Sequence, residues 1–576
     1  MIILGLNIFH GDAAACIIKD GKILIAVEEE RINRIKHSSG FPIKSINYCL
    51  KYSNLKISDI DFVCINRKPN VNLIKKILFV LKNKPSFSYI LERAKNLKNI
   101  SSLKDIFLRY FRKDQLKFKI ITVEHHLSHI SSSFHISGFD NSSVLSVDGF
   151  GDFVSTMWGY ADKKNINING SVYFPHSLGI FYTAITQHLG FTNYGDEYKL
   201  MGLSSYGSDI QTEKLYELFV DRSHQFKLNL KYFNHVNNKF NLDFYDEKPI
   251  IGNLFNDKIK EILGPARNPL DEITPHHKDI AKSTQIIYEE IFFKVLNNLF
   301  DQTKNHNLCL SGGCAQNSVA NGKILSNTKF KNLYVSSSSG DSGGAIGSAT
   351  YFLSKKKIFL NKEHSSYYGP KFSDDEIKRC IKNNEKKLNN ISQINFKNDN
   401  DFTNYIAKAI YDKKIVGWFQ GRMEWGPRAL GNRSILANPA APDIKSIINT
   451  KIKRRESFRP FAPAILEEYT QDWFEGNHES LFMSFVSKVK NDKKNIIPAV
   501  VHVDGTGRLQ TVNQKTNERF YNLIKKFYAI SGIPMILNTS FNENEPIVMR
   551  PEEALDCLIR TEMDGLFLNN YFVKKN

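Results

Sequence analysis

The chain has 576 residues, of which 41% are hydrophobic, 12% aromatic and 24% charged. This length exceeds one ordinary hydrophobic core and predicts roughly two to four globular domains. The longest apolar runs are far shorter than a bilayer span and no signal peptide opens the chain, so we expect a cytoplasmic protein without a transmembrane segment. Seven scattered cysteines without a Cys-x-x-Cys pair fit a reducing compartment and disfavour a disulfide framework.

The net charge is +19, and much of it comes from one segment. Arg67 to Lys119 holds fifteen Lys or Arg residues against three acids, Glu92, Asp105 and Asp114. Within it, "VNLIKKILFVLKNK" predicts a basic amphipathic helix. Such a surface can meet nucleic acid, an anionic membrane or a phosphorylated substrate, and we expect it to help recruit an anionic substrate. A solvated insertion is the alternative.

The N-terminal part predicts a duplicated α/β architecture. A first strand, "IILGLNIF", is followed by a hairpin whose strands "AAACIIKDG" and "KILIAVEEE" meet at Asp20-Gly21, a strong turn signal. A similar pattern returns at 144–165, where "VLSVDG" and "FVSTMWGYADK" flank a small-residue turn. Two such copies are typical of the superfamily of actin, sugar kinases and Hsp70, which binds its ligand between the halves.

Further along, "HHKDIAKSTQIIYEEIFFKVLNNLF" predicts an amphipathic helix. "NLCLSGGCAQNSVANGKIL" and "LYVSSSSGDSGGAIGSATYFL" each predict a strand, a glycine-rich turn and the start of a helix. Backbone-rich loops at helix N-termini bind anions and nucleotides, although plain helix–strand packing is an equal alternative for one such loop. The composition becomes polar and charged after these segments, which places a domain boundary near 355–370.

A metal site is predicted from "HHLSH", at the start of a helix after the strand "KIITV". His125 and His129 are spaced i, i+4, so their rings share one helical face. Asp148 and Asp341 are candidate oxygen ligands from later loops. Two imidazoles with carboxylates and open positions suit iron(II), zinc or manganese. A polar helix face is the alternative, and the lack of His-Glu-x-x-His disfavours a metalloprotease.

The stretch "GRMEWGPRALGNRS", Gly421 to Ser434, predicts an anion-binding loop. Glycines let the backbone approach a ligand closely, and arginine forks bind phosphate or carboxylate in a bidentate way. Further cationic and polar side chains follow in "NTKIKRRESFRPFAPAIL", "HVDGTGRLQTV" and "ILNTSFNENEPIV". These loops suit a polyanionic ligand such as a nucleoside triphosphate. The chain lacks a Walker-type Gly-Lys-Ser/Thr loop, which disfavours an ordinary P-loop protein.

Taken together, these strings resemble the O-carbamoyltransferases that act on nodulation factors, cephamycins and tobramycin, the NodU/CmcH type. The matching pieces run in order along nearly the whole chain. Besides the strings already quoted, they are "HGDAAACIIKDGKILIAVEEERINRIKH", "VEHHLSHISSSF", "SVDGFGD", "DEYKLMGLSSYG", "SGDSGGAIGSA" and "RRESFRPFAPAIL". Only about 67–119 and parts of 205–265 are undistinguished.

The resemblance implies an actin-like carbamoyl-transfer domain at 1–360 and a YrdC-like domain at 361–576 that forms carbamoyl-adenylate from carbamoyl phosphate and ATP, with Mg²⁺ as companion of ATP. The N-terminal domain would hold iron and transfer the carbamoyl group to a substrate hydroxyl. For carbamoyl phosphate and ATP, the motifs imply Arg428, Lys453, Arg459, Arg508, Asn538 and Ser540. For the metal, they imply His125, His129, Asp148 and Asp341.

For the carbamoyl-adenylate in the N-terminal domain, the motifs imply Gly312, Gly313, Asn317, Gly343 and Gly344. The catalytic assignments are His10, Asp12 and Lys36. His10 is expected to assist deprotonation of the acceptor, and Lys36 matches a ligand-binding lysine in "RIKH". The first loop departs from the pattern, because it has His10-Gly11-Asp12 where many members have His followed directly by Asp.

Three other readings remain. A tRNA threonylcarbamoyladenosine-type enzyme would share both domain types, but the domain order and "MEWGPRALGNRS" argue against it, and we expect no nucleic-acid partner. A sugar kinase or ATPase leaves the histidine pair unexplained, and a nucleotide-sensing scaffold gives the arginine-rich loops no task. The sequence leaves open whether the acceptor is a saccharide or a secondary metabolite, and it leaves the oligomeric state open, a homodimer included.

Overall fold

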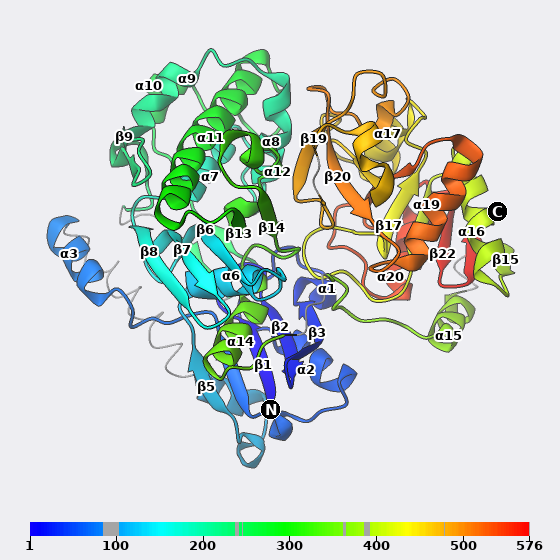
Figure 1. The fold of residues 1–576 in the computed structure, drawn as a ribbon, viewed down its shortest axis with the longest axis horizontal. Helices are drawn as coiled ribbons and strands as arrows, with labels where there is room; N and C mark the ends of the chain where they lie inside the picture. Colours follow the sequence, from blue (N-terminus) through cyan, green and yellow to red (C-terminus); the bar gives the residue numbers. More distant parts are fainter. Residues whose placement is uncertain are drawn as a thin grey trace. The chain divides into compact units, whose positions relative to one another are not determined.

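The computed structural model describes residues 1–83, 103–236, 241–244, 246–360, 365–384, 392–476 and 479–574. The chain folds into two compact units (Figure 1). The first comprises Met1–Asn33, His37–Asn317 and Lys323–Glu363, and the second comprises Arg34–Lys36, Ser318–Gly322 and His364–Asn576. After Glu363 the chain belongs to the second unit up to its last residue.

The first unit contains two five-stranded sheets with the same topology. One has the order β3-β2-β1-β4-β5, with β1 (Ile2–Asn7), β2 (Ala14–Lys19), β3 (Lys22–Glu28), β4 (Phe62–Ile65) and β5 (Lys119–Thr122). The other has the order β8-β7-β6-β13-β14, with β6 (Asn141–Gly151), β7 (Val154–Asp162), β8 (Ile166–Tyr173), β13 (Asn307–Ser311) and β14 (Asn332–Val335). In each sheet the first three strands pair antiparallel and the last two join in parallel. The duplicated α/β architecture expected from the two hairpins is confirmed.

The hairpin turns follow from their residues. Asp20 and Gly21 join β2 to β3 with φ of 49° and 77°, the left-handed pair that matches the twist of a hairpin. Asp152 and Phe153 join β6 to β7 with φ of 48° and 75°. Phe153 holds this less favourable conformation while its ring packs on Phe174, with ring centroids 5.3 Å apart.

Two helices each pack on the sheet of the other half. Helix α6 (His125–Phe134) follows β5 but packs on β6 and β13, and α14 (Gly343–Lys355) follows β14 but packs on β1 and β4. The two helices also contact each other. Their small residues allow this: a Cβ on Gly347 would lie 1.9 Å from the carbonyl oxygen of Ser128. This exchange ties the halves together and brings the N-terminal ends of both helices into one site.

The remaining elements of the first unit surround these sheets. The expected amphipathic helix is α11 (Pro275–Thr303), which begins after Thr274 with proline at its first position. The others are α1 (Glu30–Asn33), α2 (Ile43–Tyr52), α3 (Leu73–Asn83), α5 (Leu103–Tyr110), α7 (Leu178–His188), α8 (Glu197–Leu203), α9 (Thr212–Leu215), α10 (Ile259–Leu263), α13 (Ile324–Asn327), β9 (Phe219–Asp221), β10 (Lys227–Leu228), β11 (Leu242–Asp243) and β12 (Ile250–Ile251).

The second unit is built on one nine-stranded mixed sheet, in the order β15-β23-β22-β16-β17-β21-β18-β20-β19. Its strands are β15 (Ser392–Asn395), β16 (Val416–Phe419), β17 (Arg433–Ala437), β18 (Ala462–Leu466), β19 (Phe485–Lys488), β20 (Thr506–Val512), β21 (Met535–Ser540), β22 (Gly565–Leu568) and β23 (Tyr571–Lys574). Asn538 and Ser540 lie in β21.

Helices complete the core of the second unit. Helix α16 packs against α19, and α15 packs against α20. The helices of this unit are α12 (Ser318–Asn321), α15 (Asp374–Asn384), α16 (Asp399–Tyr411), α17 (Ile444–Ile447), α18 (Thr470–Trp473), α19 (Glu518–Ser531) and α20 (Pro551–Arg560). Among the described residues of the whole chain, no helix is both long and apolar enough to cross a bilayer.

Candidate metal centre and anion site

Four side chains converge in the first unit. His125 and His129 come from α6, Asp148 from β6 and Asp341 from the turn before α14, and their ligand atoms all lie within 4.8 Å of one another. The Oδ2 of Asp148 lies 3.1 Å from the Nε2 of each histidine, and the two Nε2 atoms are 3.0 Å apart. The Oδ1 of Asp341 lies 3.5 Å from both nitrogens. The chain thus brings together all four residues that the motifs imply for a metal.

Backbone contacts orient Asp148. Its Oδ1 accepts hydrogen bonds from the N–H groups of Gly149 at 2.8 Å and Gly313 at 3.1 Å. This leaves Oδ2 directed at the histidine pair. A glycine is needed at 313 for this close approach, because a Cβ there would lie only 2.8 Å from Asp148 Oδ1. The glycine-rich loop after β13 therefore supports the carboxylate.

Packing orients His125. Its Nδ1 and that of His129 have no hydrogen-bond partner among the described residues, so the usual hydrogen bond to the outer ring nitrogen is missing. Instead, the ring of His125 lies against Gly151, where a Cβ would fall 2.0 Å from its Cδ2, and against the ring of His10 at a centroid distance of 4.7 Å. The position of His125 thus depends on a glycine at the end of β6.

The electrostatics of the cluster are those of a site that attracts positive charge. Burial opposes the charged form of His129, but Asp148 and Asp341 outweigh it and raise the pKa of His129 to about 10. Burial also disfavours charge on Asp148, yet hydrogen bonds with the two histidines hold its pKa well below the usual value. Burial and the charge of Asp148 raise the pKa of Asp341.

The donor set could hold a metal ion. Two bare imidazole nitrogens at 3.0 Å repel each other, so a proton or a cation must lie between them and the carboxylates. Two nitrogens and two carboxylate oxygens around one point suit iron(II), zinc or manganese, whose bonds to such donors are about 2.0–2.2 Å long.

The middle histidine of "HHLSH" has another task. His126 places Nδ1 2.9 Å from Ser146 Oγ and Nε2 3.0 Å from the carbonyl oxygen of Val154, both within the buried core. Burial, followed by the charge of His125, lowers the pKa of His126 to about 3. His126 therefore joins α6 to its sheet as a neutral ring.

The loop that contains His10, Gly11 and Asp12 lies beside the cluster. The Nδ1 of His10 is 4.0 Å from Asp341 Oδ2, and burial, then Arg67 and His125, lower the pKa of His10 well below its usual value. A Cβ on Gly11 would lie 2.3 Å from the hydroxyl oxygen of Tyr194, which gives the departure from the family pattern a steric reason.

Asp12 is held within the same loop. Its Oδ1 lies 2.8 Å from Nδ1 of His37, a residue that the sequence did not single out. The side-chain amide of Asn7 donates to the carbonyl oxygens of Gly11 at 2.9 Å and Asp12 at 2.8 Å, and Asn66 in turn donates to Asn7. Unlike His10 and Asp12, Lys36 belongs to the second unit, in the segment Arg34–Lys36, and its side chain is exposed in a turn.

The other glycines have mainly steric roles. A Cβ on Gly312 would lie 2.2 Å from the Val147 carbonyl oxygen, one on Gly343 would lie 2.1 Å from that of Ser338, and one on Gly344 would lie 2.3 Å from Asn66 Nδ2. Asn317 forms a reciprocal amide pair with Gln285 of α11, at 3.0 and 3.1 Å. These contacts fix the two glycine-rich loops near Asp148 and Asp341.

In the second unit, four arginines gather around β20. Burial, then the charges of Arg428, Arg459 and Arg455, lower the pKa of Arg508 well below its usual value. A guanidinium stays protonated at neutral pH, so this shift expresses the cost of bringing like charges together. Arg508 donates to Ser318 Oγ, in a segment of the same unit, at 3.0 and 3.2 Å. An anion bound here would relieve the repulsion.

Two arginines of "GRMEWGPRALGNRS" differ from the expectation. Arg433 is fully buried, lies 3.6 Å from the centre of the Phe419 ring and donates to backbone carbonyls, including that of Pro370 at 3.3 Å. Arg422 donates to the carbonyls of Tyr368 at 2.6 Å and Gly369 at 2.9 Å. They shape the loop, because backbone carbonyls accept from both terminal nitrogens of Arg433 and from Nε and one terminal nitrogen of Arg422.

A buried glutamate also shapes this loop. The Oε1 of Glu424 accepts backbone hydrogen bonds from Leu430 at 2.7 Å, Asn432 at 2.8 Å and Arg433 at 3.1 Å. The sequence gave no reason to single out Glu424, since its role appears only once the loop folds back on itself. These contacts join the part of the loop before Arg428 to the part after it.

Lys453, Ser540 and Asn538 support the arginine group. The buried ammonium of Lys453 donates to the carbonyl and, at 3.1 Å, the hydroxyl oxygen of Ser540, and to the carbonyl oxygen of Asn542 at 2.8 Å. Asn538 donates to Gln510 at 2.8 Å and to the carbonyl of Ala429 at 3.2 Å. Asn538 thus holds the residue next to Arg428.

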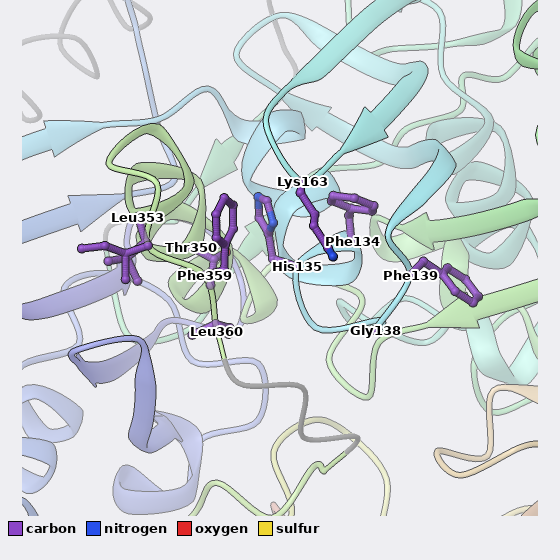
Figure 2. Close-up of a pocket in the computed structure, with 10 residues that line it drawn as sticks. Phe134, His135, Gly138, Phe139, Lys163, Thr350, Leu353, Phe359 and Leu360 are labelled. Carbon is purple, nitrogen blue, oxygen red and sulfur yellow. The ribbon is translucent and has the colours of Figure 1, made fainter.

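A cavity of about 250 Å³ in the first unit lies elsewhere (Figure 2). It is lined mainly by apolar residues such as Phe134, Phe139 and Leu353, from the C-terminal ends of α6 and α14 and the loop after α6. Phe134 is nine residues beyond His125, which corresponds to about 13 Å along a helix. Lys163 at the cavity is paired with Asp140 at 2.9 Å. This cavity is therefore separate from the histidine cluster.

Comparison with known proteins agrees with the motifs. Residues 2–350 match the family model of the carbamoyltransferase N-terminus, and residues 407–575 match that of the carbamoyltransferase C-terminus. The chain belongs to the carbamoyltransferase family. The resemblance found in the sequence is thereby confirmed at the level of the family, and the protein is a transferase.

Individual relatives match most of the chain. It is 36% identical over 575 residues to nodulation protein NolNO of Sinorhizobium fredii, covering 99% of this chain and 80% of that protein. It is 35% identical over 471 residues to nodulation protein NolO of Bradyrhizobium diazoefficiens, covering 79% of each. Among solved structures, HypF of T. kodakarensis aligns with a TM-score of 0.33 at 14% identity, over 63% of this chain and 48% of that one. A likeness this weak adds nothing to the strand order.

Proposed function

We propose that this carbamoyltransferase is an ATP-dependent O-carbamoyltransferase that works in two half-reactions. In the first, water splits carbamoyl phosphate into carbamate and phosphate, and a carbamate oxygen then attacks the α-phosphorus of ATP, giving carbamoyl-adenylate and releasing pyrophosphate. The second transfers the carbamoyl group from carbamoyl-adenylate to a hydroxyl of a saccharide or secondary-metabolite acceptor, with AMP as the leaving group. The observation that carries the proposal is the gathering of Arg428, Arg455 and Arg459 around Arg508, a grouping of like charges that calls for a polyanionic ligand.

The first half-reaction is assigned to the second unit, for which we propose a YrdC-like role. Both substrates are multiply charged anions, so charge neutralisation and positioning supply most of the catalysis. The arginines would bind the phosphates. Lys453, Ser540 and Asn538 would hold the loops on which these arginines stand, since their polar atoms are engaged with Asn542, Gln510 and the backbone.

The second half-reaction is assigned to the first unit. His125, His129, Asp148 and Asp341 would hold iron(II), with zinc or manganese as alternatives, and such an ion would act as a Lewis acid and template. His10 would accept the proton of the acceptor hydroxyl, and burial supports this role because it lowers the pKa of His10 and so keeps the ring neutral. Asp12 and its partner His37 would fix the backbone of this loop. The glycine-rich loops that contain Gly312 and Gly343 would receive the carbamoyl-adenylate.

The two half-reactions can be tested separately. Release of pyrophosphate should depend on both ATP and carbamoyl phosphate. Arg428→Ala should lower this rate by roughly 30- to 1000-fold, the effect of losing about 2–4 kcal/mol of phosphate stabilisation, whereas Arg379→Ala on the exposed face of α15 should not change it. His129→Ala should lose metal and carbamoyl transfer but keep pyrophosphate release. Full pyrophosphate release by folded Arg428→Ala would overturn the assignment.

A further inference from the structure

Helix α3 exposes a continuous apolar face. Five large aliphatic side chains of this eleven-residue helix are more than half exposed, from 52% at Leu73 to 74% at Ile74, with Ile77, Leu78 and Leu81 between them. At 100° per residue these positions occupy an arc of about 140°. Single exposed aliphatic residues are ordinary, but a contiguous group of five marks an interaction surface.

The opposite side of α3 attaches the helix to the first unit. Phe79 is 9% exposed, and its ring centroid lies 4.9 Å from that of Phe174 and 5.9 Å from that of Phe153. Lys75 places its ammonium 4.9 Å from the centre of the Tyr173 ring, at the end of β8. In Figure 1, α3 lies at the margin of the first unit beside β8. The helix is therefore held in place with its apolar face turned outward.

Positive charge borders the apolar face. On a helical projection Lys75 and Lys82 lie about 40–60° beyond Leu78, at one edge of the apolar arc. The helix contains no acidic residue. It stands in the segment Arg67 to Lys119, whose excess of twelve positive charges accounts for most of the net charge of +19. Residues 84–102 of that segment, Lys84 among them, lie outside the described residues.

We propose that α3 binds an anionic lipid surface, lying in the interface with its aliphatic side chains among the acyl chains and its lysines at the phosphates. The helix is about 16 Å long, which suits an orientation parallel to the surface. The exposed face is purely aliphatic, whereas the centres of protein interfaces are enriched in aromatic residues and arginine. Lysines that flank an apolar face match the anionic phosphates of a lipid surface.

This proposal does not depend on the carbamoyl-transfer assignment. It also changes the role expected for the basic segment, from recruiting an anionic acceptor directly to placing the protein on a membrane. Among the residues that the structure describes, the five aliphatic side chains of this face are already exposed.

Vesicle sedimentation of the full chain tests the proposal. We expect binding to phosphatidylcholine vesicles that contain a quarter phosphatidylglycerol, weaker binding at high salt, and little binding to phosphatidylcholine alone. Ile74→Glu with Ile77→Glu should reduce binding at least tenfold. Val220→Glu with Leu270→Glu adds the same charge at residues that are 72% and 94% exposed elsewhere in the first unit, and should bind more tightly than the α3 pair.

The lysines provide a second test. Lys82→Gln should weaken binding by about fivefold, while Lys51→Gln, at an exposed lysine outside the segment, should have a smaller effect. Equal binding to neutral and anionic vesicles, or wild-type binding by the Ile74/Ile77 variant, would overturn the proposal. It would also be overturned if the wild type ignored vesicles and instead formed a dimer that Ile74→Glu with Ile77→Glu separates.

Discussion

Replacing Gly151 by alanine should displace His125, a proposed metal ligand, although none of the four proposed ligands is itself substituted. A Cβ at this position would lie 2.0 Å from Cδ2 and 2.1 Å from Cγ of His125, whereas ordinary contact begins at 3.4 Å. The ring or the strand must therefore move by about 1.4 Å, the difference between the two distances. Metal sites tolerate only about 0.2 Å in their bond lengths, so the four donors could no longer converge.

The consequences can be separated by measurement. We expect Gly151→Ala to lower metal affinity by roughly tenfold or more, to abolish carbamoyl transfer, and to keep pyrophosphate release. Overpacking should cost about 1–3 kcal/mol of stability, which thermal unfolding would report. Metal content after dialysis, measured by plasma mass spectrometry, is the primary readout.

A neighbouring glycine supplies the control. Gly149 stands two residues away on the same strand, and a Cβ there meets nothing within 4 Å. Alanine at 149 keeps the N–H group that donates to Asp148, so Gly149→Ala should retain metal, stability and activity. If folded Gly151→Ala bound metal and transferred the carbamoyl group as the wild type does, the place given to His125 would be refuted.

Three further outcomes follow from the buried and clustered charges. Arg455→Ala should slow pyrophosphate release at least tenfold, because Arg455 is one of the charges that bear on Arg508; an unchanged rate would remove it from the anion site. Arg433→Ala should leave several buried carbonyls unsatisfied and lower stability by about 3–5 kcal/mol, or roughly 10 °C in the melting temperature; a melting temperature equal to that of Arg379→Ala would contradict this. Burial lowers the pKa of His188 to about 4, so the folded chain binds fewer protons than the unfolded chain between about pH 4 and 6.5, and stability falls as the pH drops through this window. The free energy of unfolding should therefore decrease between pH 7 and pH 5, and His188→Gln should make this decrease smaller by roughly 2 kcal/mol. Denaturant unfolding at both pH values measures it, and an equal decrease in wild type and variant would contradict the lowered pKa of His188.

Local patterns predicted much of the first unit. The turn at Asp20–Gly21, the helix that became α11 and the strands before both glycine-rich loops are encoded by residues close in sequence, and the structure contains them all. The exchange of α6 and α14 between the sheets could not be predicted in this way. It depends on small residues such as Gly347 meeting Ser128 across more than two hundred positions, which periodicity does not record.

The spacing of residues in the sequence predicted the candidate sites better than the mere presence of a residue type. The i, i+4 spacing separated His125 and His129 from His126, and the structure gives His126 a purely packing role. The number of arginines in a loop was a poorer guide, because burial decides the role of each side chain. Arg433 donates to backbone carbonyls, whereas the charge of Arg428 acts on Arg508 and lowers its pKa. Partners such as His37 and Glu424 emerge only from the fold, since their contacts join loops rather than repeat along the chain.

The most direct test of the account is to look for its intermediate. Purified protein would be incubated with ATP and carbon-13-labelled carbamoyl phosphate without any acceptor, and the quenched mixture analysed by mass spectrometry. The account predicts labelled carbamoyl-adenylate together with pyrophosphate, and no such product when either substrate is omitted. Absence of labelled carbamoyl-adenylate at every time point, with ATP left intact and no pyrophosphate released, would contradict the account.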